Sequence, residues 1–162
     1  MRRVPALLVC VLAALLSAKP AWGADFAIDL KVKTGKAAQI AHAHKAGIGS
    51  KPERRPVLEI KAGQRVHAQW QLRCSAAAQP VKDVLIHFFV VREKKTGQAA
   101  LPRLDKTVTV ESALSMDFKA GAKTDGELDF VLDKAGVYLV RLETRGAGAG
   151  SETYAALDVI VH

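Results

Sequence analysis

The sequence predicts an all-β fold, an antiparallel sandwich of eight or nine short strands. Three observations carry this prediction: apolar and polar residues alternate over most segments, turn residues separate these segments, and helical periodicity is almost absent. A barrel is the alternative for the same pattern. The chain has no strand–helix–strand rhythm, which argues against a parallel α/β fold.

The first 23 residues have the features of a secretory signal peptide. Arg2 and Arg3 form a basic start, an apolar run covers residues 4–18, and the small residue Gly23 precedes the expected cleavage site. The run is shorter than the roughly 20 residues that a membrane-spanning helix needs. We therefore expect export to the periplasm or beyond, no transmembrane segment after cleavage, and a single domain over residues 24–162.

Composition limits the partners and the redox chemistry of the processed chain. Three of its 24 basic residues precede the cleavage site, so 21 basic residues remain against 16 acidic ones and the formal charge is +5. This charge suits contact with anionic surfaces. Only Cys74 remains after cleavage, so no intrachain disulfide can form, and the register of its strand predicts a buried thiol.

The first half of the domain shows strands on either side of a basic segment. Residues 25–33 alternate strictly and predict a half-buried strand. Residues 34–56 break the pattern and are rich in Ala, Gly and Lys, which predicts a basic surface excursion, with a short helix over residues 36–45 as the alternative. Residues 57–61 resume the strand pattern.

Residues 65–74 alternate cleanly and predict a strand with one face in the core. Trp70 lies in register with Val66 and Leu72, so we expect its indole to be buried and its truncation to alanine to cost roughly 3–5 kcal/mol. The opposite face of this strand is polar throughout.

The second half of the domain predicts a central strand and several half-buried ones. Residues 84–91 are apolar on both faces except at His87, which indicates a strand covered on both sides. Residues 124–126 read Thr-Asp-Gly and predict a hairpin turn. The other expected strands are 107–111, 113–118, 127–132, 137–144 and 154–161.

Residues 133–138, Asp-Lys-Ala-Gly-Val-Tyr, resemble the corner before the penultimate strand of immunoglobulin-like and fibronectin type III-like domains. In those families the tyrosine hydroxyl bonds back to the chain, so the resemblance implies a structural role for Tyr138 and an immunoglobulin-like sandwich. The spacing is one residue longer than the immunoglobulin pattern, and no Cys follows. The whole processed chain also resembles exported bacterial domains of uncharacterised function.

Residues 58–66 resemble the early strand pair of cupredoxins, and His87 lies where a first copper ligand of that family could fall. A blue-copper centre needs a cysteine thiolate, two imidazoles and usually a methionine. Residues 137–162, which correspond to the region that supplies the later ligands, contain no Cys and no Met. The sequence therefore disfavours a blue-copper centre.

His42 and His44 are the best indication of a metal site. In an extended strand, residues two apart share a face and can chelate one ion, whereas in a helix they diverge. His87 or His67 could complete such a site, although no carboxylate cluster accompanies the pair. A solvated surface pair is the competing interpretation.

No motif predicts catalysis. The chain lacks a Gly-x-Ser-x-Gly sequence. Four acidic residues lie within 125–133, but alternation puts Glu127 and Asp129 on the solvent face of a strand, and the repeated oxygen donors of a calcium loop are not present. The basic segment 34–56 has no interleaved aromatics, so base stacking and specific nucleic-acid binding are not expected.

We therefore expect a non-enzymatic binding or structural module without a cofactor, in contact with a protein or an anionic envelope polymer. The alternative is a periplasmic copper- or zinc-binding protein that uses His42, His44 and His87.

Overall fold

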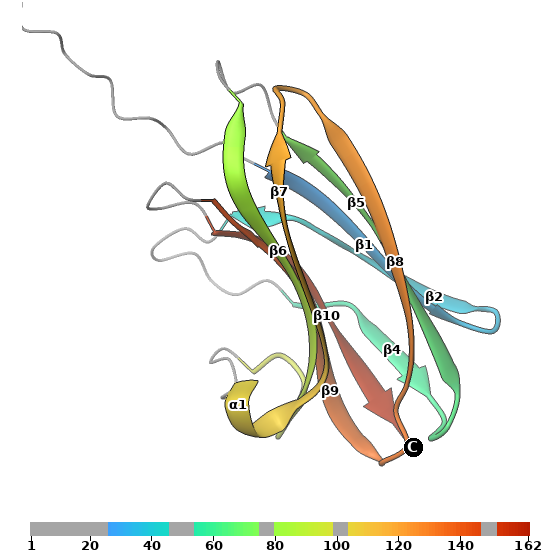
Figure 1. Ribbon diagram of the computed structural model, residues 1–162. Helices are drawn as coiled ribbons and strands as arrows, with labels where there is room; N and C mark the ends of the chain where they lie inside the picture. Colours follow the sequence, from blue (N-terminus) through green and yellow to red (C-terminus); the bar gives the residue numbers. More distant parts are fainter. Residues whose placement is uncertain (1–25, 46–53, 75–79, 99–103, 147–151) are drawn as a thin grey trace, which may run out of the picture.

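The computed structural model describes residues 26–45, 54–74, 80–98, 104–146 and 152–162, which contain ten strands and one short helix (Figure 1). In chain order the elements are β1 (Phe26–Thr34), β2 (Ala37–His42), β3 (His44–Lys45), β4 (Val57–Ile60), β5 (Arg65–Cys74), β6 (Val81–Glu93), α1 (Leu104–Thr107), β7 (Val108–Phe118), β8 (Lys123–Val131), β9 (Gly136–Arg145) and β10 (Glu152–Val161). The predicted signal peptide and its cleavage site lie outside the described residues.

The strands form two separate sheets. Sheet A has the order β2-β1-β5-β8, and its neighbours are antiparallel. Sheet B has the order β3-β10-β9-β6-β7, and β4 pairs in parallel with β10. The predicted all-β fold is confirmed, and among the described residues the strands do not close into the barrel that was its alternative.

The inner faces of the two sheets share one hydrophobic core. Strand β1 contributes alternate residues, as its sequence predicts, because a pleated strand turns every second side chain to the same face. Cys74 is fully buried in this core, which confirms the expected buried thiol, and the burial raises the pKa of that thiol. Sheet B contributes residues that include Ile86, Phe88, Val140, Leu142, Leu157 and Val159.

A second apolar cluster covers the outer face of sheet B. Phe89, Val91, Leu139 and Ala156 are buried there, and Leu104 of α1 packs against them. Strand β6 is therefore buried on both faces, as its nearly continuous apolar sequence predicts. Helix α1 was not predicted, because four residues are too few to show a helical period.

The predicted surface excursion is partly wrong, because strands β2 and β3 lie within it. Gly35 adopts a φ of +52° at the turn between β1 and β2, where Thr34 faces Ala37. A short isolated helix is marginal in water, whereas pairing with β1 satisfies the backbone of residues 37–42. Ala41 is also buried in the core. Residues 46–53 lie outside the described part of the chain.

The predicted hairpin turn at residues 124–126 is wrong. These residues lie inside β8, where Gly126 pairs with Trp70 of β5. The chain turns earlier, where the Ala122 N–H donates to the Lys119 carbonyl at 3.0 Å. The strands expected at 107–111 and 113–118 form a single strand, β7, which passes from sheet B to β8 in sheet A through this turn.

The corner expected at Tyr138 is present. Its hydroxyl donates to the backbone carbonyl of Lys134 at 2.8 Å, at the entrance to β9, and the ring is buried in the core. The described part of the chain has no helix that is long and apolar enough to cross a membrane.

Candidate functional site: two depressions that meet at Trp70

Trp70 points from β5 toward the space between the sheets, but it is only half-buried. Its indole stacks on Phe88 of sheet B, with ring centroids 5.5 Å apart and an interplanar angle of 18°. Trp70 therefore packs against the core, as the sequence predicted, but its indole is less buried than expected. The reason is its position: β8, the neighbour of β5, and β7, the neighbour of β6, are both edge strands, so the sandwich is open at this side.

Gly126 gives the Trp70 indole its room. A methyl group at this glycine would lie 2.4 Å from Cε2 of Trp70, far inside van der Waals contact. The Asp-Gly sequence suggested a turn, but its glycine lies in a strand, where the missing side chain makes room for the ring of Trp70 on the neighbouring strand. Trp70 and Gly126 both line two depressions in the surface.

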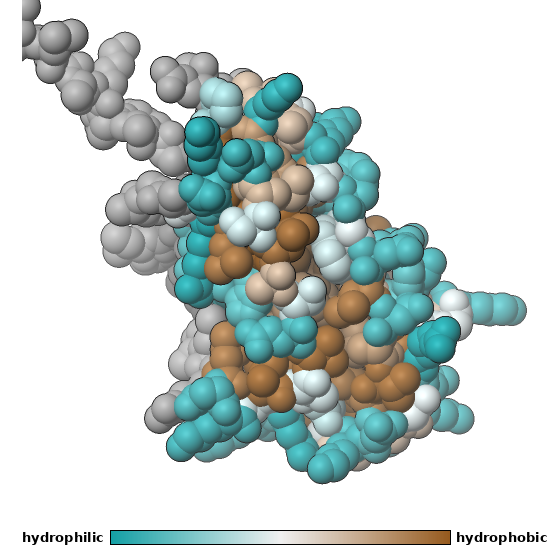
Figure 2. All heavy atoms as spheres, viewed as in Figure 1, coloured by the Kyte–Doolittle hydropathy of each residue, from teal (hydrophilic) through white to brown (hydrophobic). Residues whose placement is uncertain are grey.

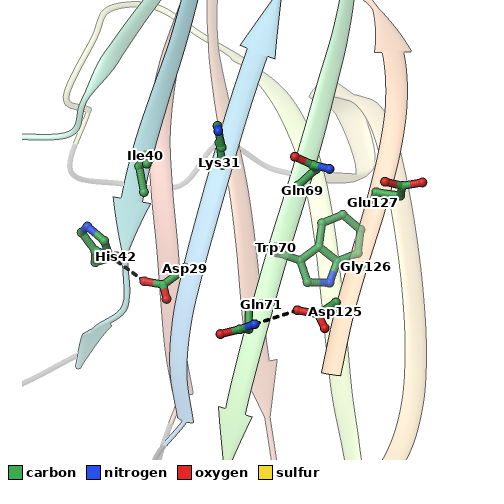
Figure 3. Close-up of a pocket in the computed structure, with 10 residues that line it drawn as sticks. All are labelled: Asp29, Lys31, Ile40, His42, Gln69, Trp70, Gln71, Asp125, Gly126 and Glu127. Atoms are coloured by element: carbon green, nitrogen blue, oxygen red, sulfur yellow. Dashed lines mark hydrogen bonds and ion pairs between the residues drawn. The ribbon is translucent and has the colours of Figure 1, made fainter. Parts of the chain in front are cut away.

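The larger depression lies on the outer face of sheet A and has a volume of about 720 Å³ (Figure 3). All four strands of the sheet contribute to it. Its lining residues are Asp29, Lys31, Ile40, His42, Gln69, Trp70, Gln71, Asp125, Gly126 and Glu127.

The polar side chains of this depression lie in two rows across the sheet (Figure 3). The row that starts at His42 continues through Asp29 and Gln71 to Asp125, and the next row contains Ile40, Lys31, Gln69 and Glu127. Adjacent strands are about 4.8 Å apart, so each row presents hydrogen-bonding groups at a regular spacing.

Two contacts within the first row fix its side chains. Nδ1 of His42 lies 2.6 Å from Oδ1 of Asp29, and the Gln71 amide donates to Oδ1 of Asp125 at 3.0 Å. Each contact joins neighbouring strands. Gln71 therefore keeps its amide oxygen as an acceptor for a ligand, and Asp125 keeps its second carboxylate oxygen.

The charge of the depression is more acidic than the whole chain. Three carboxylates, on Asp29, Asp125 and Glu127, line it together with one lysine, Lys31. A polyanion would meet these carboxylates directly, so the depression suits a ligand without dense negative charge.

The smaller depression is a slot of about 170 Å³ at the open side of the sandwich. Ser112 and Leu114 of β7 line it, as does Leu128 of β8. Leu114 faces the same way as the core residues of sheet B, yet it is 58% exposed. Figure 2 shows hydrophobic residues at the surface in the region of β7 and β8, with hydrophilic residues around them.

The structure separates the histidines that the sequence suggested as metal ligands. His42 lies on the outer face of sheet A beside Asp29, and His87 lies on the outer face of sheet B. The backbone of His44 pairs with Tyr154 of sheet B, so the chain changes sheets between His42 and His44. His67 shares the outer face of sheet A with His42, but it bonds to Asp129 at 2.6 Å, two rows away.

His87 belongs instead to a network of charges on sheet B. Its Nε2 lies 2.8 Å from Glu111 and its Nδ1 lies 3.4 Å from the fully buried Glu143. Glu143 also accepts from Nε of Arg141 and pairs with Arg145, both at 2.8 Å. Pairing of this kind removes the large cost of burying a lone carboxylate, which explains the network as a structural feature. In the described residues, no group of three or more His, Cys, Asp or Glu side chains is arranged to hold a metal ion.

The basic segment does not present all its charges to solvent. Arg55 reaches back to Glu93 at 2.8 Å and to Asp158 at 3.0 Å, and it is largely buried. Lys31 and Lys33 lie on β1, where they share the face of sheet A with the acidic residues of β8. Within the described residues, Arg55 is therefore committed to partners inside the fold, and the two lysines of β1 lie among carboxylates.

Sequence reasoning missed Gln69 and Gln71, which stand at the centre of the larger depression. The sequence feature that could have identified them is the polar face of residues 65–74, which alternates as regularly as the apolar face. Its importance depends on which strands flank β5, and only the sheet order supplies that information.

No protein-family model and no curated protein matches the chain. Solved structures of low similarity include the PmoD soluble domain from Methylocystis sp. ATCC 49242 (Rockwell), with 12% identity, a TM-score of 0.45 and coverage of 83% of this chain and 90% of that one. The C-terminal domain of Wzt has 11% identity, a TM-score of 0.42 and coverage of 81% and 77%. A family 123 glycoside hydrolase from Clostridium perfringens has 8% identity, a TM-score of 0.44 and coverage of 67% and 23%. Likenesses at this level carry no argument about function.

Proposed function

We propose that this chain is a non-catalytic, exported binding module that holds an extended, hydroxyl-rich envelope polymer on the outer face of sheet A. The observation that carries the proposal is the depression of about 720 Å³, in which polar side chains of four strands stand in rows. An open surface of this kind leaves water in contact with the ligand, which suits binding better than chemistry that needs water excluded.

The chemistry of the lining residues favours hydroxyl groups. A hydroxyl both donates and accepts hydrogen bonds, the amides of Gln69 and Gln71 do the same, and the nearby carboxylates accept. The overall positive charge of the chain suggested an anionic envelope polymer as partner. The acidic residues that line the depression favour instead a polymer with few anionic groups. The tyrosine corner at Tyr138 supports an immunoglobulin-like origin for the scaffold.

The proposal is tested with a glycan microarray and with co-sedimentation on purified peptidoglycan. We expect retention of the wild-type protein on at least one neutral or weakly charged glycan. A Gln69→Ala/Gln71→Ala variant should bind roughly ten-fold more weakly or worse, because two hydrogen bonds to the ligand are lost.

A Lys94→Ala/Lys95→Ala variant serves as the control, since both lysines are exposed in the turn after β6 and do not line the depression. It should bind like the wild type. Absence of binding to every glycan, or equal binding by the glutamine variant, would overturn the proposal.

A further inference from the structure

Strand β7 is an edge strand with unusually little protection. It is 11 residues long and pairs with β6 on one side, while on its other side no strand of the described chain pairs with it. Natural edge strands avoid pairing with other chains by being short or by carrying lysine, proline or inward-pointing charges. Strand β7 has no Lys, Arg, Pro or Gly, and its charged residues are Glu111 and Asp117.

The other edges of the described sheets differ from β7. Strand β8 carries Lys123, Asp125, Glu127 and Asp129 within nine residues, and β2 and β4 have six and four residues. The absence of protection is therefore a feature of β7 and not of the fold as a whole.

The face of β7 that is directed toward the core is apolar except at Ser112, and it is not covered by sheet A. Leu114, opposite Ile86, is 58% exposed, and Val110 and Met116 on the same face are only partly buried. Sheet A ends at β8 and does not cover these residues, which leaves the slot beside Leu114 open. An apolar strip next to unpaired backbone groups is the arrangement to which another strand is added.

We propose that β7 pairs antiparallel with β7 of a second copy of this chain, about a two-fold axis at Ser115. This inference goes beyond the proposed function and uses a different surface. The pairing joins the B sheets of the two copies into one continuous sheet, and because the same surface is used twice the dimer is closed.

The sequence of β7 and the residue that follows it are complementary to themselves in this register. Glu111 lies opposite Lys119 of the second copy, so each dimer contains this pair of opposite charges twice. Leu114 lies opposite Met116 of the second copy, on the face that is apolar and exposed in the single chain. Asp117 lies opposite Ala113, so no like charges are placed directly across from each other.

The experiment measures the oligomeric state of the protein purified after export, by sedimentation equilibrium from micromolar to millimolar concentration. We expect a reversible dimer for the wild type. Leu114→Lys should raise the dissociation constant at least roughly ten-fold, because it places a charge at the centre of the contact. Ile40→Lys is the matched control and should leave the dissociation constant unchanged. Ile40 is also exposed, at 48%, but it lies on β2, the edge strand of sheet A that is farthest from β8.

Charge reversal tests the register. Lys119→Glu should weaken the dimer, because it places a second carboxylate opposite Glu111, whereas Lys119→Arg keeps the positive charge and should dimerise like the wild type. Glu111 is left unchanged because its carboxylate also contacts His87 at 2.8 Å. Circular dichroism and the thermal midpoint of each variant report whether the fold is kept. A protein that is monomeric at all concentrations, as it would be if β7 receives a strand of another protein, overturns the proposal. A dimer that is insensitive to Leu114→Lys or to Lys119→Glu also overturns it.

Discussion

Gly126 decides at the scale of one residue how β5 and β8 fit together. The space that a side chain would occupy is filled by the Trp70 indole, and a methyl group there would be 2.4 Å from the ring. The indole cannot move inward easily, because it stacks on Phe88. A substitution at this glycine must therefore displace a packed aromatic ring.

We expect Gly126→Ala to lower the free energy of unfolding by about 1–3 kcal/mol, the usual cost of overpacking. Urea denaturation followed by the fluorescence of Trp70 measures it. Gly146→Ala is the control, because the nearest atom to a methyl group at Gly146 is Val81 Cγ1 at 4.0 Å, an ordinary contact. Equal midpoints for Gly126→Ala and the wild type would show that the ring yields without cost.

His42 illustrates how a residue's neighbours limit its chemistry. Its Nδ1 is 2.6 Å from Asp29, which orients the ring, but the second histidine of the sequence pair lies on a strand of the other sheet. One imidazole and one carboxylate leave half of the positions of a four-coordinate ion to water.

We therefore expect no submicromolar Cu(II) or Zn(II) site that depends on His42 and His44. Calorimetric titration of the wild type and of His42→Ala/His44→Ala checks this, and the two titrations should agree. A tight site that disappears in the variant would restore the metal-binding alternative.

At the scale of elements, the corner before β9 shows what a short sequence pattern can predict. The hydroxyl of Tyr138 donates to the Lys134 carbonyl, four residues earlier, and so joins the chain that leaves β8 to the start of β9. The pattern is local, so the sequence contains all of the information that the contact needs.

Tyr138→Phe should lower the free energy of unfolding by about 1 kcal/mol, since it leaves the carbonyl without its buried donor while the ring is kept. Thermal and urea unfolding measure this change. Lys134→Ala is the control, because the acceptor is a backbone atom that alanine retains, and it should unfold with the wild type. A loss for Lys134→Ala as large as that for Tyr138→Phe would mean that the side chain of Lys134 carries the corner.

Strands were predicted well where their pattern was complete in itself. The strands predicted at residues 25–33, 65–74 and 137–144 are present as β1 (Phe26–Thr34), β5 (Arg65–Cys74) and β9 (Gly136–Arg145). Residues 37–42 were not predicted as a strand, because alanine-rich sequence favours a helix locally and the unpaired edge of β1 is visible only in the fold. Residues 124–126 were predicted as a turn for a similar reason: the partner that needs Gly126 is 56 positions away in the sequence.

At the scale of the whole molecule, one buried charge cluster ties distant parts of the chain together. Arg55, which precedes β4, pairs with Glu93 at the end of β6 and with Asp158 in β10. The Gly97 N–H also donates to Asp158 at 2.7 Å. Burial raises the pKa of both carboxyls, and Arg55 opposes this rise without cancelling it.

The direction of these shifts sets a pH dependence. A carboxyl whose pKa is higher in the folded than in the unfolded state binds a proton more readily when folded, so protonation favours folding. The contribution of Glu93 to stability therefore rises as the pH falls from 7 through its folded pKa, and it is complete below the unfolded value, about 4.5.

We expect the wild type to gain stability relative to Glu93→Gln as the pH is lowered from neutral toward about 4, because the glutamine cannot take up a proton. Urea midpoints of the two proteins across this range measure the difference. Val131→Ala, at a residue 42% exposed on β8, removes no titratable group; it is the control and should show no such trend. A wild type that loses stability relative to Glu93→Gln as the pH falls would contradict the sign.

The sequence by itself determined the all-β class, most of the strands, the inward faces, the buried thiol and the tyrosine corner, because each depends on a period of two residues or on contacts a few residues apart. Only the tertiary structure decided the order of strands in the sheets. That order places the larger depression on sheet A, leaves the sandwich open beside Trp70, separates His42 from His87 and leaves β7 as an uncovered edge strand. Those features arise from residues far apart in the chain, and their placement depends on how the two sheets pack against each other, which no local pattern records.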